Sequence, residues 1–95
     1  MPTPPESESE TSRNRVAIVT GAAQGIGLGI ATVLAQKGFR VALADFQREK
    51  AIAESRELES LGFQAIGVGL DVTSSESWAH AVREVESHFG PVGIL

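Results

Sequence analysis

The feature that most constrains the fold is a regular alternation of short apolar runs with longer segments of helical periodicity. The apolar runs occupy residues 16–19, 40–44, 65–70 and 92–95, and the helical segments between them occupy residues 25–37, 47–61 and 73–89. A short run that is apolar on both faces fits a strand of a parallel sheet, because helices cover both sides of such a sheet. The order therefore predicts an α/β fold with a doubly wound parallel sheet, in the sequence β-α-β-α-β-α-β.

Periodicity within the helical segments indicates how each helix is placed. A capping box formed by Thr73 and Glu76 is expected to start the third helix, and glycines at positions 38, 62 and 90 are expected to end the three helices. Gly67 and Gly69 are expected to weaken the third strand. The residues that recur at helical spacing are Ile26, Ile30, Val33 and Leu34 in the first segment, Ala51, Ser55, Leu58 and Leu61 in the second, and Trp78, Val82, Val85 and Phe89 in the third.

Composition indicates one small globular domain preceded by a tail. The 95-residue chain is 42% hydrophobic and 21% charged and has no cysteine, which excludes disulfides, thiolate catalysis and cysteine-ligated metals. Residues 1–14 carry no large apolar side chain after Met1, so we expect a disordered tail there and a domain at residues 15–95. The first residues lack the basic and apolar regions of a secretory signal, and we expect a cytoplasmic location.

Charge and the length of the apolar runs argue against several kinds of partner. The formal net charge of −4 gives the chain no electrostatic reason to bind nucleic acid or anionic lipid. No apolar run approaches the roughly 18 residues that a membrane span requires. His80 and His88 stand eight positions apart without further ligands beside them, so we interpret them as surface residues and expect no metal site.

The sharpest local feature is the segment Thr20-Gly21-Ala22-Ala23-Gln24-Gly25-Ile26-Gly27, where the first strand passes into the first helix. A diphosphate at a helix N-terminus needs outward-pointing backbone N–H groups and no side chain in the way. Gly21 would allow a sharp turn, Gly25 would leave room for the diphosphate, and Gly27 would let the helix pack close to the sheet. The segment predicts a diphosphate site built from backbone amides. The alternative is a glycine-rich turn without a ligand.

The spacing T-G-x-x-x-G-x-G resembles that of the short-chain dehydrogenase/reductase family, and the resemblance runs from about Arg15 to Leu95. Asp45 after the second apolar run, Asp71-Val72 after the third, and the segment 89–95 support it. The resemblance implies the amino-terminal portion of a Rossmann-type NAD(P)-binding domain, incomplete at residue 95, with strand order 3-2-1-4. It also implies an oxidoreductase that interconverts an alcohol and a carbonyl, with hydride transfer to or from NAD(H).

Asp45 bears on the choice of cofactor, because it lies near the offset at which an acid reaches an adenosine ribose. A carboxylate there accepts hydrogen bonds from both ribose hydroxyls and repels a 2′-phosphate. The alternative is that Asp45 only forms the turn at the strand end. In the family, a basic residue at the position of Gln24 or Phe46 signals NADP, so the resemblance implies NAD, with NADP less favoured. Arg48 lies close enough to affect this preference.

Asp71 and Val72 resemble the family's adenine pocket, in which the carboxylate accepts from the adenine amino group. An equally physical alternative is that Asp71 only helps to start the next helix. The predicted cofactor-binding residues are Thr20, Gly21, Gln24, Gly25, Ile26, Gly27, Asp45, Phe46, Asp71 and Val72.

The family's catalytic residues have no counterpart in these 95 residues. Family members use a Tyr-x-x-x-Lys pair, a serine on the fifth strand and an Asn-Asn-Ala-Gly segment, all at positions beyond Leu95, and this sequence has no tyrosine. We expect the chain alone to be inactive, and a full-length form to bind a small alcohol or carbonyl and to oligomerise through its further segments. The alternatives are a non-catalytic nucleotide-binding module and an interaction protein that uses an exposed sheet edge.

Overall fold

Three parallel strands alternate with three helices along residues 15–93, the part of the chain that the computed structural model describes. Along these residues the sheet has the order β1-β2-β3, and both strand pairs are parallel. The predicted α/β class and the 3-2-1 part of the predicted strand order are therefore confirmed. The elements are β1 (Val16–Thr20), α2 (Gly25–Gln36), β2 (Arg40–Asp45), α3 (Arg48–Ser60), β3 (Ala65–Gly69) and α4 (Ser75–Phe89).

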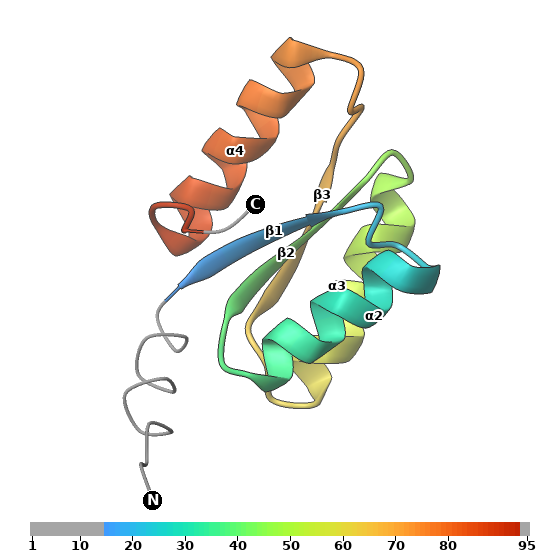
Figure 1. Cartoon of the computed structure of the whole chain (residues 1–95), viewed down its shortest axis with the longest axis vertical. Coiled ribbons are helices and arrows are strands. Elements are labelled where there is room, and N and C mark those ends of the chain that lie inside the picture. The colour runs from blue at the N-terminus through green and yellow to red at the C-terminus, as the bar shows by residue number, and fades with distance from the viewer. Residues whose placement is uncertain (1–14, 94–95) are drawn as a thin grey trace, which may run out of the picture.

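Helices cover both faces of the sheet, with α2 and α3 on one face and α4 on the other (Figure 1). Strand β2 shows why the strands are apolar on both sides. Val41 and Leu43 belong to the core cluster under α2 and α3, whereas Ala42 and Ala44 belong to the cluster under α4. Because successive side chains of a strand point to opposite faces, one continuous apolar run supplies both cores.

The register of the strands brings their carboxyl ends to one edge of the sheet. Thr20 pairs with Ala44, and the next residue of β2, Asp45, pairs with Gly69. The segments that leave β1, β2 and β3 therefore start side by side. In doubly wound sheets this edge is where ligands bind.

Helix α2 packs against the sheet through its small residues, and the face predicted from its large apolar residues is wrong. Its buried residues are Ala31 and Ala35. A Cβ on Gly27, one turn before Ala31, would lie only 2.1 Å from the carbonyl oxygen of Gly21. The helix approaches the end of β1 so closely that only small side chains fit between them. Leu34 packs at the edge of this core, but the remaining predicted residues are exposed: Ile26 at 83%, Ile30 at 48% and Val33 at 48%.

Helix α3 follows the prediction except at its end. Ala51, Ser55 and Leu58 are buried, whereas Leu61 is 67% exposed because it lies just beyond the last helical residue. Gly67 of β3 has a packing role that the sequence analysis did not anticipate. A Cβ there would lie 2.5 Å from the carbonyl carbon of Ala51, so the glycine admits the backbone of α3.

Helix α4 begins with a cap one residue later than predicted. The hydroxyl of Ser74 accepts a hydrogen bond from the Ser77 N–H at 3.1 Å, and the predicted box of Thr73 and Glu76 is therefore wrong. Thr73 instead donates to Asp71. The predicted apolar stripe is confirmed, since Val85 is buried in the core under α4 and Trp78, Val82 and Phe89 pack against it.

Two predicted segments lie wholly or partly outside the described residues. The predicted tail at 1–14 is one of them, and residues 94–95 of the predicted fourth strand are the other. Residues 91–93 are described and are not in a strand. The Gly93 N–H nevertheless donates to the Val16 carbonyl at 2.9 Å, so the chain returns alongside β1 after α4.

Candidate nucleotide-binding site

The glycine turn between β1 and α2 has the backbone conformation that its sequence predicts. Gly21 and Gly25 have φ values of +63° and +62°, the left-handed region that glycine adopts without strain. A Cβ at either position would meet no atom within 4 Å, so the space beside the turn is open. Gln24 is the N-cap residue of α2, and its side chain makes no capping hydrogen bond. The first N–H groups of α2 are therefore not capped by Gln24.

Asp45 connects the end of β2 to this turn. One carboxylate oxygen accepts from the Ala23 N–H at 3.1 Å, and the other accepts from the Gln47 N–H at 2.9 Å. The Ala22 N–H also donates to the Ala44 carbonyl at 3.2 Å. The turn-forming alternative for Asp45 is thus present in the structure, through Gln47. The same carboxylate also faces the glycine turn, where a ligand would lie.

A cavity of about 330 Å³ opens at the carboxyl ends of the three strands. Its apolar residues include Phe46 and Val72, whose side chains are 78% and 59% exposed. Large exposed apolar side chains beside a cavity are typical of a site that stacks a flat apolar ligand group. The lining residues are Gly21, Ala44, Asp45, Phe46, Leu70, Asp71 and Val72.

Five of the ten predicted site residues line this cavity: Gly21, Asp45, Phe46, Asp71 and Val72. The other five lie on the adjoining segment, at the end of β1, in the turn and at the start of α2: Thr20, Gln24, Gly25, Ile26 and Gly27. Ala44 and Leu70 line the cavity but were not predicted, although each directly precedes a predicted aspartate. Ala23, which donates to Asp45, carried no sequence signal.

Asp71 is tied to the start of α4. One of its carboxylate oxygens accepts from the Thr73 N–H at 3.0 Å and from the Thr73 hydroxyl at 2.7 Å. Its own N–H donates to the Ser77 hydroxyl at 2.9 Å. The helix-starting alternative for Asp71 is therefore present in the structure. Asp71 also lines the cavity, as a role toward adenine would require.

We expect Asp71 to lose its stabilising effect in acid. The hydrogen bonds from the Thr73 hydroxyl and N–H hold the pKa of Asp71 below its ordinary value of 3.8. Since the pKa is depressed in the folded chain, the stabilisation is complete above the ordinary pKa of the unfolded chain and disappears as the pH falls through the lower folded value. Urea unfolding of the parent and of Asp71→Asn, from about pH 6 to about pH 3, should show the difference in stability shrinking with falling pH. A difference that stays constant across this range contradicts the expectation.

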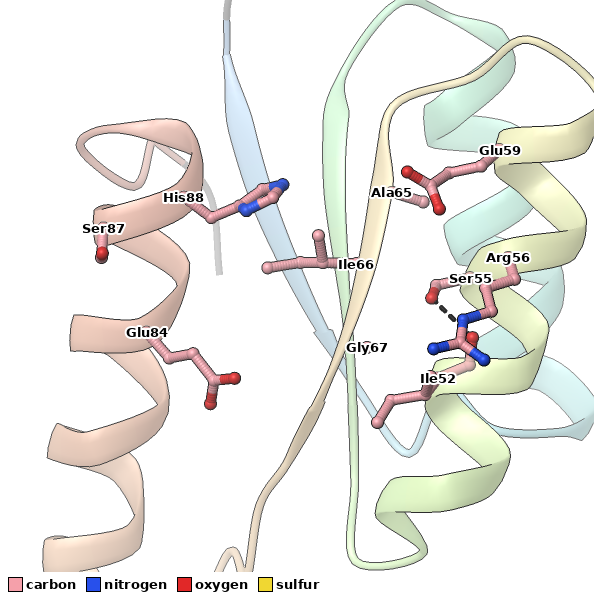
Figure 2. Close-up of a pocket in the computed structure, with 10 residues that line it drawn as sticks. All are labelled: Ile52, Ser55, Arg56, Glu59, Ala65, Ile66, Gly67, Glu84, Ser87 and His88. Atoms are coloured by element: carbon pink, nitrogen blue, oxygen red, sulfur yellow. Dashed lines mark hydrogen bonds between the residues drawn. The ribbon is translucent and has the colours of Figure 1, made fainter.

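A larger cavity, of about 440 Å³, lies between α3 and α4 beside β3 (Figure 2). Its lining includes Arg56, Glu59, Glu84 and His88, which extend from the two helices on either side of Ile66. It shares no lining residue with the smaller cavity and includes no residue of the glycine turn. We assign the candidate site to the smaller cavity, because that cavity combines apolar walls, two carboxylates and a neighbouring helix N-terminus.

Within residues 15–93, no helix has the length and apolar character needed to cross a membrane, and no three acidic or histidine side chains come close enough to hold a metal ion. His80 and His88 are exposed, in agreement with their interpretation as surface residues. The ring of His88 packs edge-on against Phe89, with ring centroids 4.8 Å apart.

Comparison with known proteins identifies the family. The family model described as short chain dehydrogenase matches residues 15–95. The C alpha-dehydrogenase of Sphingobium sp. is 41% identical over 83 residues, and the L-2,3-butanediol dehydrogenase of Corynebacterium glutamicum is 43% identical over 84 residues. These alignments cover 87% and 86% of this chain but 27% and 33% of the relatives. The chain belongs to the short-chain dehydrogenase/reductase family and spans about a third of the length of the curated relatives it matches.

Solved structures agree with this assignment. A hydroxysteroid dehydrogenase from Escherichia coli superposes with a TM-score of 0.83 at 34% identity, over 92% of this chain and 38% of that chain. The apo form of LigD from Sphingobium sp. gives a TM-score of 0.78 at 41% identity, over 82% of this chain and 33% of that chain. The family implies a nicotinamide dinucleotide cofactor.

Proposed function

We propose that this chain binds the adenosine diphosphate part of NAD, as the cofactor-binding portion of an oxidoreductase that interconverts an alcohol and a carbonyl. The observation that carries the proposal is the cavity at the strand ends, with Asp45 and Asp71 on its wall and the open glycine turn beside it. When bound, the nicotinamide group supplies the hydride acceptor or donor. Every role given below belongs to the binding of the cofactor, and no residue of this chain is given a catalytic role.

The glycine turn fits a diphosphate. The open space at Gly21 and Gly25 would admit phosphate oxygens close to the backbone, and the N-terminus of α2 carries the positive end of the helix dipole. Thr20, Gln24 and Ile26 belong to the same short segment. We propose that backbone N–H groups of this segment hold the diphosphate, while Gly27 keeps α2 close enough to present them.

The cavity fits an adenosine. Asp45 would accept hydrogen bonds from the ribose hydroxyls. Each of its two carboxylate oxygens has two lone pairs and accepts from only one backbone N–H, so each oxygen can accept one further hydrogen bond. Phe46 and Val72 would cover the faces of the adenine ring, and Asp71 would accept from its amino group. The charge of Asp45 disfavours a 2′-phosphate, so the proposal favours NAD over NADP.

The relatives suggest the kind of substrate. Their names describe dehydrogenases of 2,3-butanediol and galactitol, which are alcohols. We infer an alcohol or carbonyl substrate for the whole protein. The residues that line the cavity are assigned to the cofactor in this proposal, so they give no indication of which alcohol is used.

We expect Asp45→Ala to weaken NAD binding by about tenfold and to narrow the preference for NAD over NADP, because charge-assisted hydrogen bonds to the ribose are lost. Titration of the folded chain with each dinucleotide, followed by the amide resonances of Gly21 and Gly25, measures both quantities. Asp45→Asn is the matched control, since its amide oxygen can still accept from the Ala23 N–H while the charge is gone.

Both variants should narrow the preference if the charge sets it. If the amide resonances of Gly21 and Gly25 in the parent chain do not shift when NAD is added in large excess, the binding proposal is refuted. NAD binding with an unchanged preference in both variants would remove only Asp45 from its assigned role.

A further inference from the structure

The two basic residues that follow Asp45 in the first turn of α3 extend in different directions. The Arg48 guanidinium lies 3.8 Å from a carboxylate oxygen of Glu84 on α4, and the aliphatic part of Arg48 covers Gly69. Arg48 is thus directed toward α4. Lys50, by contrast, donates a hydrogen bond from its Nζ to the side-chain oxygen of Gln24 in the glycine turn.

The Lys50 contact brings a positive charge to the rim of the nucleotide site. Gln24 follows Ala23, whose N–H donates to the Asp45 carboxylate at 3.1 Å. The ammonium group and the carboxylate are therefore held by neighbouring residues of one turn. Because Gln24 is a neutral amide, its contact positions the ammonium group without neutralising the charge.

This arrangement bears on how the site treats a 2′-phosphate. An adenosine ribose held by Asp45 carries its 2′-substituent beside that carboxylate. A hydroxyl there donates to the carboxylate, whereas a phosphate is repelled by it. A flexible lysine on the same rim attracts the phosphate and is nearly indifferent to the hydroxyl, since its point charge is hydrated in the absence of an anion.

Resting on the adenosine site proposed above, we propose that Lys50 is a specificity-determining residue that reduces the penalty imposed by Asp45 on a 2′-phosphate. The preference for NAD over NADP is then narrower than Asp45 alone would set. The site then binds both dinucleotides. Lys50, rather than Arg48, determines how much more weakly it binds NADP than NAD.

The test compares NAD and NADP titrations of the parent chain, Lys50→Met, Lys50→Arg and Lys37→Met. We expect Lys50→Met to raise the Kd for NADP by about fivefold and to change the Kd for NAD by less than about twofold, the size of effect that a solvent-exposed charge contact gives. Lys50→Arg keeps the charge and should retain most of the NADP binding. Lys37→Met removes the same charge at the C-terminal end of α2, far from Gln24, and should leave both Kd values nearly unchanged.

The other outcomes separate a failure of the role of Lys50 from a failure of the nucleotide site. Equal effects of Lys50→Met on both dinucleotides, or no effect on either, contradict the role of Lys50. A parent chain that binds NAD but not NADP contradicts it as well. A parent chain that binds neither refutes the nucleotide site itself, and the proposal for Lys50 with it. Because Lys50 is exposed, circular dichroism should show the same fold for all four chains.

Discussion

Replacing Gly27 by alanine is expected to lower the free energy of unfolding by about 3 kcal/mol or more, the upper range for overpacking a tight site. The added Cβ would lie 2.1 Å from the Gly21 carbonyl oxygen and 2.7 Å from its carbonyl carbon. Both are backbone atoms, so no side chain can move aside. Either α2 shifts away from the sheet or the glycine turn deforms, and in both cases we expect the proposed nucleotide binding to be lost. Urea unfolding and an NAD titration measure the two effects.

The matched control is Gly29→Ala, two residues along the same helix. A Cβ at Gly29 would meet no atom within 4 Å, and Gly29 is exposed. Alanine is the better helix former by about 1 kcal/mol, so this variant should be slightly more stable than the parent. If the two variants have equal stability, the close approach of α2 to the turn is not the reason for glycine at position 27.

The second large effect is expected for Gly67→Ala in β3. Its Cβ would lie 2.5 Å from both the carbonyl carbon of Ala51 and the N atom of Ile52. The backbone of α3 would have to move away from β3, the strand against which α3 packs most extensively. We expect a loss of about 3 kcal/mol in the free energy of unfolding, and a fall in melting temperature of more than about 10 °C for a domain of this size.

Gly69→Ala is the control for this strand. The three atoms nearest to its Cβ would be side-chain carbons of Arg48, the nearest at 3.1 Å. That side chain is flexible and can shift, so the cost should be about 0.5 kcal/mol or less. Thermal unfolding followed by circular dichroism compares the two variants. Similar melting temperatures for both would mean that α3 can retreat from Gly67 at little cost.

The order of elements was predictable from sequence because each strand is a continuous apolar run bounded by turn residues. Residues 41–44, for example, supply both cores of the sheet and therefore leave no polar face. The glycine turn was predictable from residue type. Gly21 and Gly25 occupy positive φ values, and few other residues adopt that conformation.

The buried face of α2 was not predictable from its large apolar residues. Gly27, Ala31 and Ala35 recur every four residues and form the face against the sheet. A periodicity search weighted by hydrophobic size instead selects Ile26 and Ile30, which are exposed. Size misleads here because the contact is made by backbone approach, which favours the smallest residues.

The position of Asp45 and Asp71 on the cavity was predictable, because each residue lies at or just after the carboxyl end of a parallel strand. The contact between Lys50 and Gln24 was not, because it joins a residue of α3 to a residue of the glycine turn 26 positions earlier in the sequence. The N-cap residue of α4 was also not predictable from the sequence. Thr73, Ser74 and Ser75 are all plausible caps by composition, and only the backbone path selects Ser74.

The seam between α2 and the sheet has a consequence for how this domain tolerates change. In most cores the harmful mutation removes atoms, and a scan that truncates each residue to alanine reveals the important positions. Gly27, Ala31 and Ala35 have at most one side-chain carbon, so truncation removes almost no packed atoms there. At Gly27 the backbone of α2 lies directly against the backbone of the glycine turn. An alanine scan leaves Ala31 and Ala35 unchanged and reveals this face of α2 only at Gly27, where alanine adds an atom instead of removing one. Substitutions that enlarge Ala31 and Ala35 are needed to reveal the rest of the face.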